Sequence, residues 1–262
     1  MTSGFTDLGR HTAAVRDLPG DFAGIARVLQ GLFIHEFLGE MYGVSLSDAQ
    51  KQTVHLRPAA ALLDEVLARD DRPLAVAREP AGRVATNCRG FSVLAVAMLR
   101  AHGGPARARC GFGTYFTDGW FEDHWVVEYR DGGRWKLGDA QIDEVQRPAF
   151  GITFDLGDLP PGAFLTGGEA WRSVRVRGAD PERFGLSGIP AGGDWWIAGN
   201  LVRDVAAVDG VEALPWDCWA PMPEPGATMD VELFDRMAAG EVPVTVPDKV
   251  YNALHKRTEP FT

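Results

Sequence analysis

One stretch of this chain has apolar side chains on almost every face of a helix, and it limits the folds that the sequence can adopt. From Phe91 to Leu99 only Ser92 is polar, so we expect a central helix that other elements surround. After Pro105 apolar and polar residues alternate, which is the period of a half-buried strand. A buried helix followed by strands predicts an α+β fold in which that helix packs on an antiparallel sheet.

The sequence Asp131-Gly132-Gly133 joins two further expected strands and is typical of a hairpin turn. With Asp131-Gly132 as the turn, which has the stronger turn signal, His124 lies directly opposite Asp139. With Gly132-Gly133 as the turn, Asp139 faces Val126, which is on the same strand face as His124. Either register brings the carboxylate within reach of the imidazole, whereas a three-residue loop would turn it to the other face.

The first third of the chain is expected to be mostly helical. Residues 1–20 are polar, contain Gly and Pro, and are predicted to be irregular. Apolar residues then recur every three or four positions, which predicts a helix capped by Asp21 and ending near Gly43. The same pattern predicts helices over 47–54 and from Pro58 to Leu67.

The residues after 150 are dense in glycine and proline and hold five tryptophans. Helices are expected over 200–207, 230–238 and 248–256. We find no clean linker, so we expect one domain over residues 1–262, with a helical part at 20–80, a core at 83–143 and a decorated C-terminal part at 150–262. The segments around Trp195-Trp196 and Trp216-Asp217 are expected to approach the functional site, because large aromatic rings suit the wall of a cleft.

The composition excludes several classes of partner. The net charge of −10 argues against binding to nucleic acid or to an anionic membrane. No apolar run approaches the length of a membrane span, and the N-terminus lacks a signal-peptide pattern. Three widely spaced cysteines do not form a disulfide framework. We therefore expect a reduced, cytoplasmic protein with no nucleic-acid or membrane partner, and the oligomeric state stays open.

Cys88, His124 and Asp139 carry the clearest chemical signal in the chain. Cys88 directly precedes the apolar helix, where the positive end of the helix dipole would favour a thiolate. The unpaired backbone N–H groups at a helix start would also hold an oxyanion. His124 on one strand would move the proton, and Asp139 on the next would orient the imidazole ring. This pattern predicts a thiol nucleophile served by a triad.

Four further residues are candidates for binding the substrate or the oxyanion: Asn87, Arg89, Trp125 and Gln141. Arg89 opposes the helix dipole, so it either pairs with Asp123 or another carboxylate or anchors a substrate carboxylate or phosphate. Trp125 either packs in the core or offers its indole N–H above the site. Gln141 shares the strand face of Asp139 and would orient the imidazole or bind the oxyanion.

Metal chemistry is not expected. His35-Glu36 resembles half of a zinc-binding helix, but Gly39 stands where the second histidine is needed. The remaining histidines and cysteines show no ligand spacing. Cys110 is expected to be a packing residue, and Cys218 is expected to be buried as well.

The residues around the triad resemble the transglutaminase-like superfamily in its bacterial form. The resemblance rests on Cys88-Arg89, on the segment Leu99-Arg100-Ala101-His102-Gly103-Gly104-Pro105-Ala106-Arg107, on His124-Trp125 and on Asp139 at a strand end. Gly104 replaces the usual Ile, and Ala140-Gln141 follows the acid where that family often has Pro. The motif spans about 83–143. It implies a papain-like thiol site without a cofactor, in which Cys88 is the nucleophile, His124 the base and Asp139 the orienting acid.

The expected function is thiol-dependent acyl transfer through a Cys88 thioester. The acyl donor would be a peptide, an amide or a small related carbonyl compound, and the acceptor either water, as in a protease or amidase, or an amine, as in a transglutaminase. The alternative is a catalytically silent binding or scaffold protein on the same fold. A third hypothesis, an amide-forming enzyme that acts on a carrier-bound acyl group, would need a basic docking patch.

Overall fold

The computed structural model describes residues 4–189 and 191–261, and its contacts separate the chain into two compact units. Each unit takes two segments: unit 1 consists of Met1–Ala108 and Val126–Leu159, and unit 2 of Arg109–Trp125 and Pro160–Thr262. The strands that cross from one unit into the other are β3 (Ala106–Gly113) and β4 (Phe121–Asp131). The single domain expected over residues 1–262 stays a prediction.

Unit 1 contains the expected N-terminal helices. Its α-helices are α1 (Thr12–Arg16), α2 (Phe22–Leu32), α3 (Asp48–Lys51), α4 (Ala59–Arg69), α5 (Cys88–Ala101) and α6 (Gln146–Ala149). Its 3-10 helices are η1 (Gly4–Thr6), η2 (Gly9–His11), η3 (Gly39–Tyr42), η4 (Gln52–His55) and η5 (Pro80–Gly82). Its strands, besides parts of β3 and β4, are β1 (Phe33–His35), β2 (Val84–Thr86) and β5 (Arg134–Gly138). The irregular start expected over residues 1–20 is wrong for residues 4–20, because η1, η2 and α1 occupy much of them, and residues 1–3 lie outside the described residues.

The helix predicted from Asp21 to Gly43 is present but shorter. Asp21 caps α2 as expected, yet the helix ends at Leu32 and the next three residues form β1. Strand β1 pairs in parallel with β2, so a strand satisfies the backbone groups that a longer helix would have paired. The prediction failed because two residues that supported its periodicity point into solvent: Phe37 is 66% exposed and Met41 38%.

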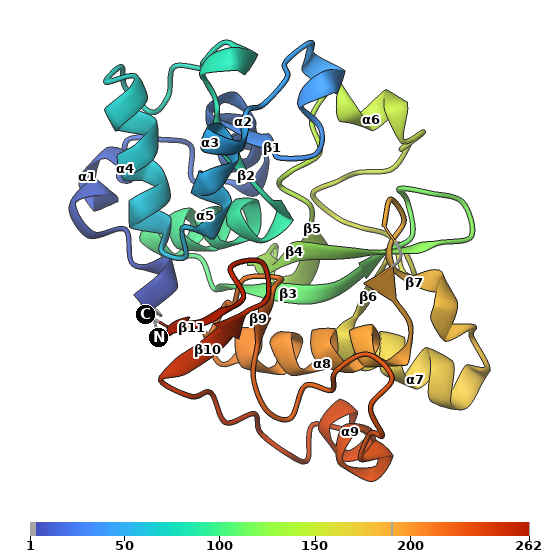
Figure 1. The fold of residues 1–262 in the computed structure, drawn as a ribbon. Helices are drawn as coiled ribbons and strands as arrows, with labels where there is room; N and C mark the ends of the chain where they lie inside the picture. The colour runs from blue at the N-terminus through green and yellow to red at the C-terminus, as the bar shows by residue number, and fades with distance from the viewer. Residues whose placement is uncertain (1–3, 190, 262) are drawn as a thin grey trace. The chain divides into compact units, whose positions relative to one another are not determined.

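Helix α5 begins at Cys88 and confirms the predicted buried helix. The side chain of Asn87 accepts the N–H of Gly90 at 3.0 Å and so caps the helix. Every residue from Cys88 to Leu99 is buried. In Figure 1 the helix is drawn in green, and it contacts α1, α2, α4 and β2. Cys88 therefore stands in the first turn of an enclosed, well-supported helix.

The hairpin between β4 and β5 selects one of the two expected registers. Asp131 pairs with Arg134, so Gly132-Gly133 forms the turn, and the register with the stronger turn signal is wrong. The two turn glycines have φ of 55° and 85°, a left-handed conformation that glycine adopts without steric cost. Continued by one step, the observed register sets Asp139 opposite Val126.

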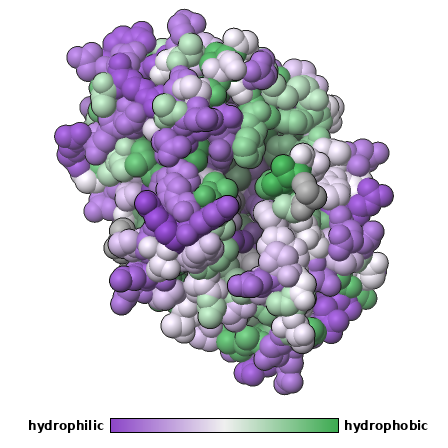
Figure 2. Space-filling model, in the orientation of Figure 1, coloured by the Kyte–Doolittle hydropathy of each residue, from purple (hydrophilic) through white to green (hydrophobic). Residues whose placement is uncertain are grey.

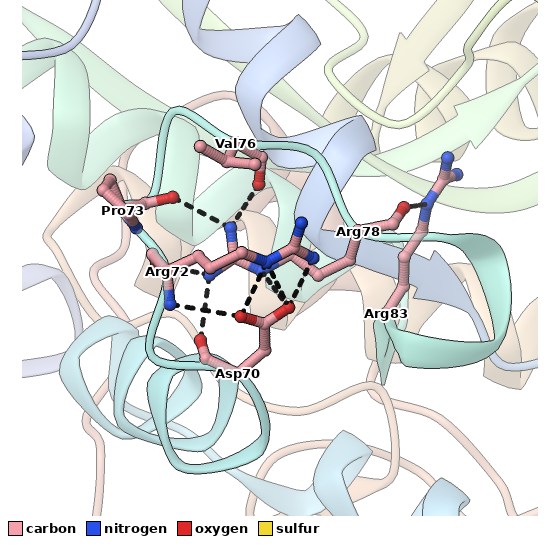
Figure 3. Close-up of polar contacts among 6 residues, drawn as sticks. All are labelled: Asp70, Arg72, Pro73, Val76, Arg78 and Arg83. Carbon is pink, nitrogen blue, oxygen red and sulfur yellow. Dashed lines mark hydrogen bonds and ion pairs between the residues drawn. The ribbon is translucent and has the colours of Figure 1, made fainter.

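A buried arginine ties together the loop between α4 and β2. The guanidinium of Arg78 donates to four backbone carbonyls (Figure 3), those of Asp70, Arg72, Pro73 and Val76. The Asp70 carboxylate binds Arg72 and lies 3.5 Å from Nε of Arg78. Hydrogen bonds from a charged donor are stronger than neutral ones. Because β2 leads into the cap of α5, this loop fixes how the chain approaches the start of that helix.

Unit 2 combines helices with short strands. Its helices are α7 (Gly167–Arg177), α8 (Asp194–Val208), α9 (Val231–Ala238) and the 3-10 helix η6 (Pro181–Arg183). Its strands, besides parts of β3 and β4, are β6 (Phe164–Thr166), β7 (Phe184–Leu186), β8 (Ala191–Gly192), β9 (Asp217–Cys218), β10 (Lys249–Asn252) and β11 (Arg257–Pro260). Helices α7, α8 and α9 contact one another (Figure 1). Strand β3 pairs antiparallel with β6, β4 parallel with β7, and β10 antiparallel with β9 and β11.

The helices predicted for this part of the chain are partly right. Those expected from Asn200 and Asp230 are present as α8 and α9. The helix expected over 248–256 is wrong, because β10 and β11 form a hairpin there. The Asn252 side chain accepts two backbone N–H groups in its turn. A side chain that bonds the backbone in this way competes with helix formation.

Helices and mixed sheets together confirm the predicted α+β class. Most strand pairs are antiparallel, and the parallel pairs among the described residues are β1 with β2 and β4 with β7. Hydrophilic side chains cover most of the face drawn in Figure 2, in keeping with a chain of 24% charged residues. Among the residues described, no helix is both long enough and apolar enough to cross a bilayer.

Candidate active site

Cys88 occupies a position that suits a nucleophile. It is the first residue of α5, where backbone N–H groups have no carbonyl of the same helix to bind. The positive end of the helix dipole favours an anion at this place. Cys88 is 8% exposed, against 0–5% for the apolar residues from Phe91 to Leu99. Cys88 is thus buried, though slightly less completely than the apolar residues that follow it.

Asp139 lies in a tight turn just after β5. Its backbone N–H donates to the carbonyl of Leu156 at 2.8 Å, and its Oδ1 accepts the N–H of Gln141 at 2.8 Å. Gln30 on α2 donates to the carbonyls on either side of Gln141. Asp139 itself is 1% exposed. These contacts fix the direction of the carboxylate within unit 1.

His124 lies on β4 within unit 2, two residues before the strand passes into unit 1. Two aromatic rings pack against its imidazole: Tyr115 at 6.1 Å and Phe116 at 4.8 Å between centroids. Both meet it edge to face, with angles of 86° and 64°. Such packing restricts the imidazole to a narrow range of orientations. By strand alternation, His124 shares its face of β4 with Val126.

The residue before His124 binds a C-terminal helix. Asp123 accepts the indole N–H of Trp196, in the first turn of α8, at 2.6 Å. Burial raises the pKa of Asp123, and the charge of Arg203 opposes that effect. The Trp195-Trp196 segment therefore reaches the immediate neighbour of the candidate base. Asp217, in the other segment that we expected near the site, accepts the N–H of Leu214.

Arg89 has a fully buried environment. Its guanidinium donates to the carbonyl of Arg57 at 2.6 Å and lies 5.5 Å from the centre of the Phe5 ring. The residue is 0% exposed. These surroundings favour a structural role beneath α5 over the alternative in which Arg89 anchors a substrate anion.

The other three candidates each keep a buried polar atom for which no partner exists among the described residues: Nδ2 of Asn87, Nε1 of Trp125 and Oε1 of Gln141. Buried polar groups are nearly always hydrogen-bonded in native proteins, so each such atom needs an explanation. Asn87 lies directly before Cys88, and Gln141 lies two residues after Asp139. Within unit 1, Cys88 and Asp139 thus each have a side chain with an unpaired hydrogen-bonding atom one or two residues away in the sequence.

Cys110 and Cys218 lie in unit 2, and their contacts are as follows. Cys110 is fully buried, and its backbone N–H donates to Asp204 at 3.1 Å. The expectation that Cys218 is buried is wrong, because the residue is partly exposed, with its Sγ 3.7 Å from the carbonyl of Trp216. Over residues 4–189 and 191–261, no three His, Cys, Asp or Glu side chains are grouped to hold a metal ion.

Comparison with known families adds one finding. Residues 51–140 match the model of the transglutaminase-like superfamily. This segment of the chain is transglutaminase-like. The match confirms the resemblance to the superfamily that was inferred from the motif, whereas its bacterial form stays a prediction, and the matched segment contains Cys88, His124 and Asp139. Comparisons with curated proteins and with solved structures gave no match.

Sequence reasoning missed a hydrogen-bonded group beside the Asp139 turn of the transglutaminase-like core. It consists of Tyr42, Asp143 and Gln146. Tyr42 is distant from the other two in sequence, so no local pattern links them. Asp143 gave the only usable signal, because an aspartate just before a short helix often binds backbone N–H groups, as it does for Gln146.

Proposed function

We propose that this protein is a cysteine-dependent acyl-transfer enzyme in which Cys88, His124 and Asp139 act as a catalytic triad. The observation that carries the proposal is the position of Cys88 in the first turn of α5, inside the segment that matches the transglutaminase-like superfamily. A cysteine kept only for packing has no need of a helix start with unpaired N–H groups.

The proposed reaction begins with attack of the Cys88 thiolate on a carbonyl carbon. A C–S bond forms, and the carbonyl π electrons move onto oxygen, where N–H groups at the start of α5 stabilise the oxyanion. The tetrahedral intermediate collapses, the C–N bond breaks, and the leaving amine takes a proton from the His124 imidazolium. A thioester on Cys88 and a neutral imidazole remain.

The second half of the cycle releases the acyl group. His124 removes a proton from water or from an amine, and that nucleophile attacks the thioester carbon. The C–S bond breaks, and Cys88 leaves as thiolate while His124 carries the proton. Asp139 would hold the imidazole in the tautomer that both proton transfers need. The product is an acid if water attacks and a new amide if an amine attacks.

The test is to trap the thioester. Wild-type protein is mixed with 4-nitrophenyl acetate, and the acetyl adduct is located by intact-mass and peptide mass spectrometry. We expect one adduct on Cys88 that neutral hydroxylamine removes, and its formation to fall by about a thousandfold or more in His124→Ala. Cys218→Ala is the matched control and should acylate normally.

Two outcomes would contradict the proposal. One is an adduct of equal yield in Cys88→Ala, which would place the reactive group elsewhere. The other is the absence of any Cys88 adduct in wild-type protein, which would favour the silent scaffold. Adding glycine amide to a confirmed acyl-enzyme then distinguishes hydrolysis from transfer, because only transfer yields N-acetylglycinamide.

A further inference from the structure

A buried amide beside Asp139 has one unused atom. Gln141 is 3% exposed, and its Nε2 donates to Oε1 of Gln146 at 3.3 Å. Its own Oε1 has no hydrogen-bond partner among the residues that the structure describes. A buried carbonyl oxygen without a donor destabilises a protein, so this oxygen is a favourable place for the N–H of a ligand.

The direction of that amide follows from a carboxylate at the far end of a hydrogen-bonded chain. Asp143 can only accept, and its Oδ2 takes the hydroxyl of Tyr42 at 2.8 Å. The Tyr42 oxygen then accepts Nε2 of Gln146 at 2.7 Å, which turns Oε1 of Gln146 toward Gln141. Gln141 must therefore offer its nitrogen to Gln146 and direct its oxygen away. The carboxylate sets both amide orientations.

Tyr42 and Asp143, at one end of this hydrogen-bonded chain, have fixed roles as donor and acceptor. Burial raises the pKa of Tyr42 above its usual range, so the phenol remains a donor at neutral pH. Oδ1 of Asp143 accepts the backbone N–H groups of Val145 and Gln146 at 2.9 and 3.0 Å. The Arg83 guanidinium lies 3.9 Å from Oδ2 of Asp143. In each of these contacts the Asp143 carboxylate faces a donor or a cation, so it acts as the acceptor.

The amide next to Cys88 is oriented in the opposite sense. As the cap of α5, Asn87 turns its Oδ1 to the N–H of Gly90, because Nδ2 cannot accept. Its Nδ2 is therefore the free end, and it has no acceptor among the described residues. Unit 1 thus offers a buried donor beside Cys88 and a buried acceptor beside Asp139.

We infer that Asn87 and Gln141 both bind the acyl donor, with Nδ2 of Asn87 binding the carbonyl oxygen and Oε1 of Gln141 binding the N–H of the leaving group. Asn87 then serves every acyl donor, and Gln141 makes the enzyme prefer amides over esters. The inference rests on the proposed thiol mechanism. A secondary amide offers both groups, whereas an ester has no N–H. Tyr42 is a positioning residue, because it acts on the substrate only through Gln146 and Gln141.

Two acyl donors that differ only at the leaving atom separate the two roles: 4-nitroacetanilide and 4-nitrophenyl acetate. The rate at which each acylates Cys88 is followed by intact mass. Gln141→Leu removes the acceptor. It should slow the acylation of Cys88 by the anilide about tenfold or more, whereas the rate of acylation by the ester should change less than about threefold. Asn87→Ser keeps a capping oxygen but removes the amide NH₂ group, and it should slow both about a hundredfold.

Matched variants test whether the hydrogen-bonded chain matters. Tyr42→Phe should lower the anilide-to-ester rate ratio as Gln141→Leu does, whereas Gln52→Leu, which changes an exposed glutamine on η4, should leave it unchanged. The inference is overturned if Gln141→Leu lowers both rates equally or changes neither, and the thiol mechanism then still stands. Absence of a Cys88 adduct in wild-type protein would instead remove the mechanism itself.

The amide direction is also measurable without turnover. In ¹⁵N-labelled protein, the side-chain NH₂ protons of Gln141 and Gln146 should exchange with solvent more than about tenfold more slowly than those of exposed Gln52. Tyr42→Phe should accelerate exchange at Gln146. Rapid exchange at Gln141 in wild-type protein would mean that its nitrogen faces outward, and this result overturns the inference whatever the activity.

Discussion

Trp196 donates its indole N–H to the buried carboxylate of Asp123, the residue that precedes His124. This bond joins the first turn of α8 to strand β4 within unit 2. It also supports a group that its environment disfavours as an anion, since burial raises the pKa of Asp123. The C-terminal part of the chain therefore contributes directly to the setting of the candidate base.

We predict that Trp196→Phe destabilises the protein by about 1–3 kcal/mol, because the buried Asp123 carboxylate loses one of its donors and keeps the side chain of Asn200. Without this hydrogen bond the pKa of Asp123 in the folded protein rises further. A carboxyl whose pKa is raised on folding lowers the stability of the protein as pH rises, so the destabilisation by Trp196→Phe should be larger at pH 7 than at pH 4. Urea unfolding at both pH values measures it. Trp195→Phe changes the same residue type one position earlier and should have a smaller effect. Equal losses in the two variants at both pH values would show that the bond to Asp123 contributes nothing.

Glu36 should make stability depend on pH. Burial raises the pKa of Glu36 to about 7, and Lys51 partly opposes this. Between its ordinary value of 4.5 and about 7, the folded protein holds a proton that the unfolded chain has released, so stability falls as pH rises through this window and then levels off. Glu36→Gln removes that loss and should be more stable than wild type at pH 8 by about 1–3 kcal/mol.

Chemical denaturation from pH 4 to pH 8 tests the Glu36 prediction. Glu40→Gln, which changes an exposed carboxylate on η3, is the control and should keep the wild-type slope. An unaltered slope in Glu36→Gln would mean that its carboxylate is well solvated in the folded protein.

Arg78 should be far more important for stability than its exposed neighbour. Arg78 is buried, and Arg78→Met leaves four backbone carbonyls without their charged donor, so it should cost about 3 kcal/mol or more. Arg72→Met removes only a solvent-exposed ion pair and should have a much smaller effect. Urea unfolding compares the two, and limited proteolysis should show cutting within residues 70–82 only for Arg78→Met. Similar stability of the two variants would contradict the structural role of the Arg78 contacts shown in Figure 3.

Helix α5 and the β4–β5 hairpin were predictable because short-range features determine them. The apolar run after Cys88 and the capping side chain of Asn87 define the helix without any distant contact. The hairpin needed only alternation and a glycine pair. Its register was misjudged because Asp-Gly and Gly-Gly both suit a turn with positive φ at the two central positions, and the structure uses Gly132-Gly133.

Contacts between distant segments were beyond sequence reasoning. The bond from Tyr42 to Asp143 and the packing of Phe116 on His124 depend on tertiary structure alone. Helix α7 is a different case, because the capping box formed by Thr166 and Glu169 was visible in the sequence. The two glycines that open this helix made the segment look like a loop.

The most direct test of the central claim is the rate at which iodoacetamide alkylates each cysteine between pH 5 and pH 9, read by peptide mass spectrometry. Exposure alone would make partly exposed Cys218 react faster than buried Cys88. A nucleophile activated by a helix start and an imidazole predicts the reverse order at neutral pH, with Cys88 slowed about tenfold or more in His124→Ala and Cys110 inert. If Cys88 alkylates no faster than Cys218 at neutral pH and is unaffected by His124→Ala, Cys88 is not a catalytic nucleophile and the account is wrong.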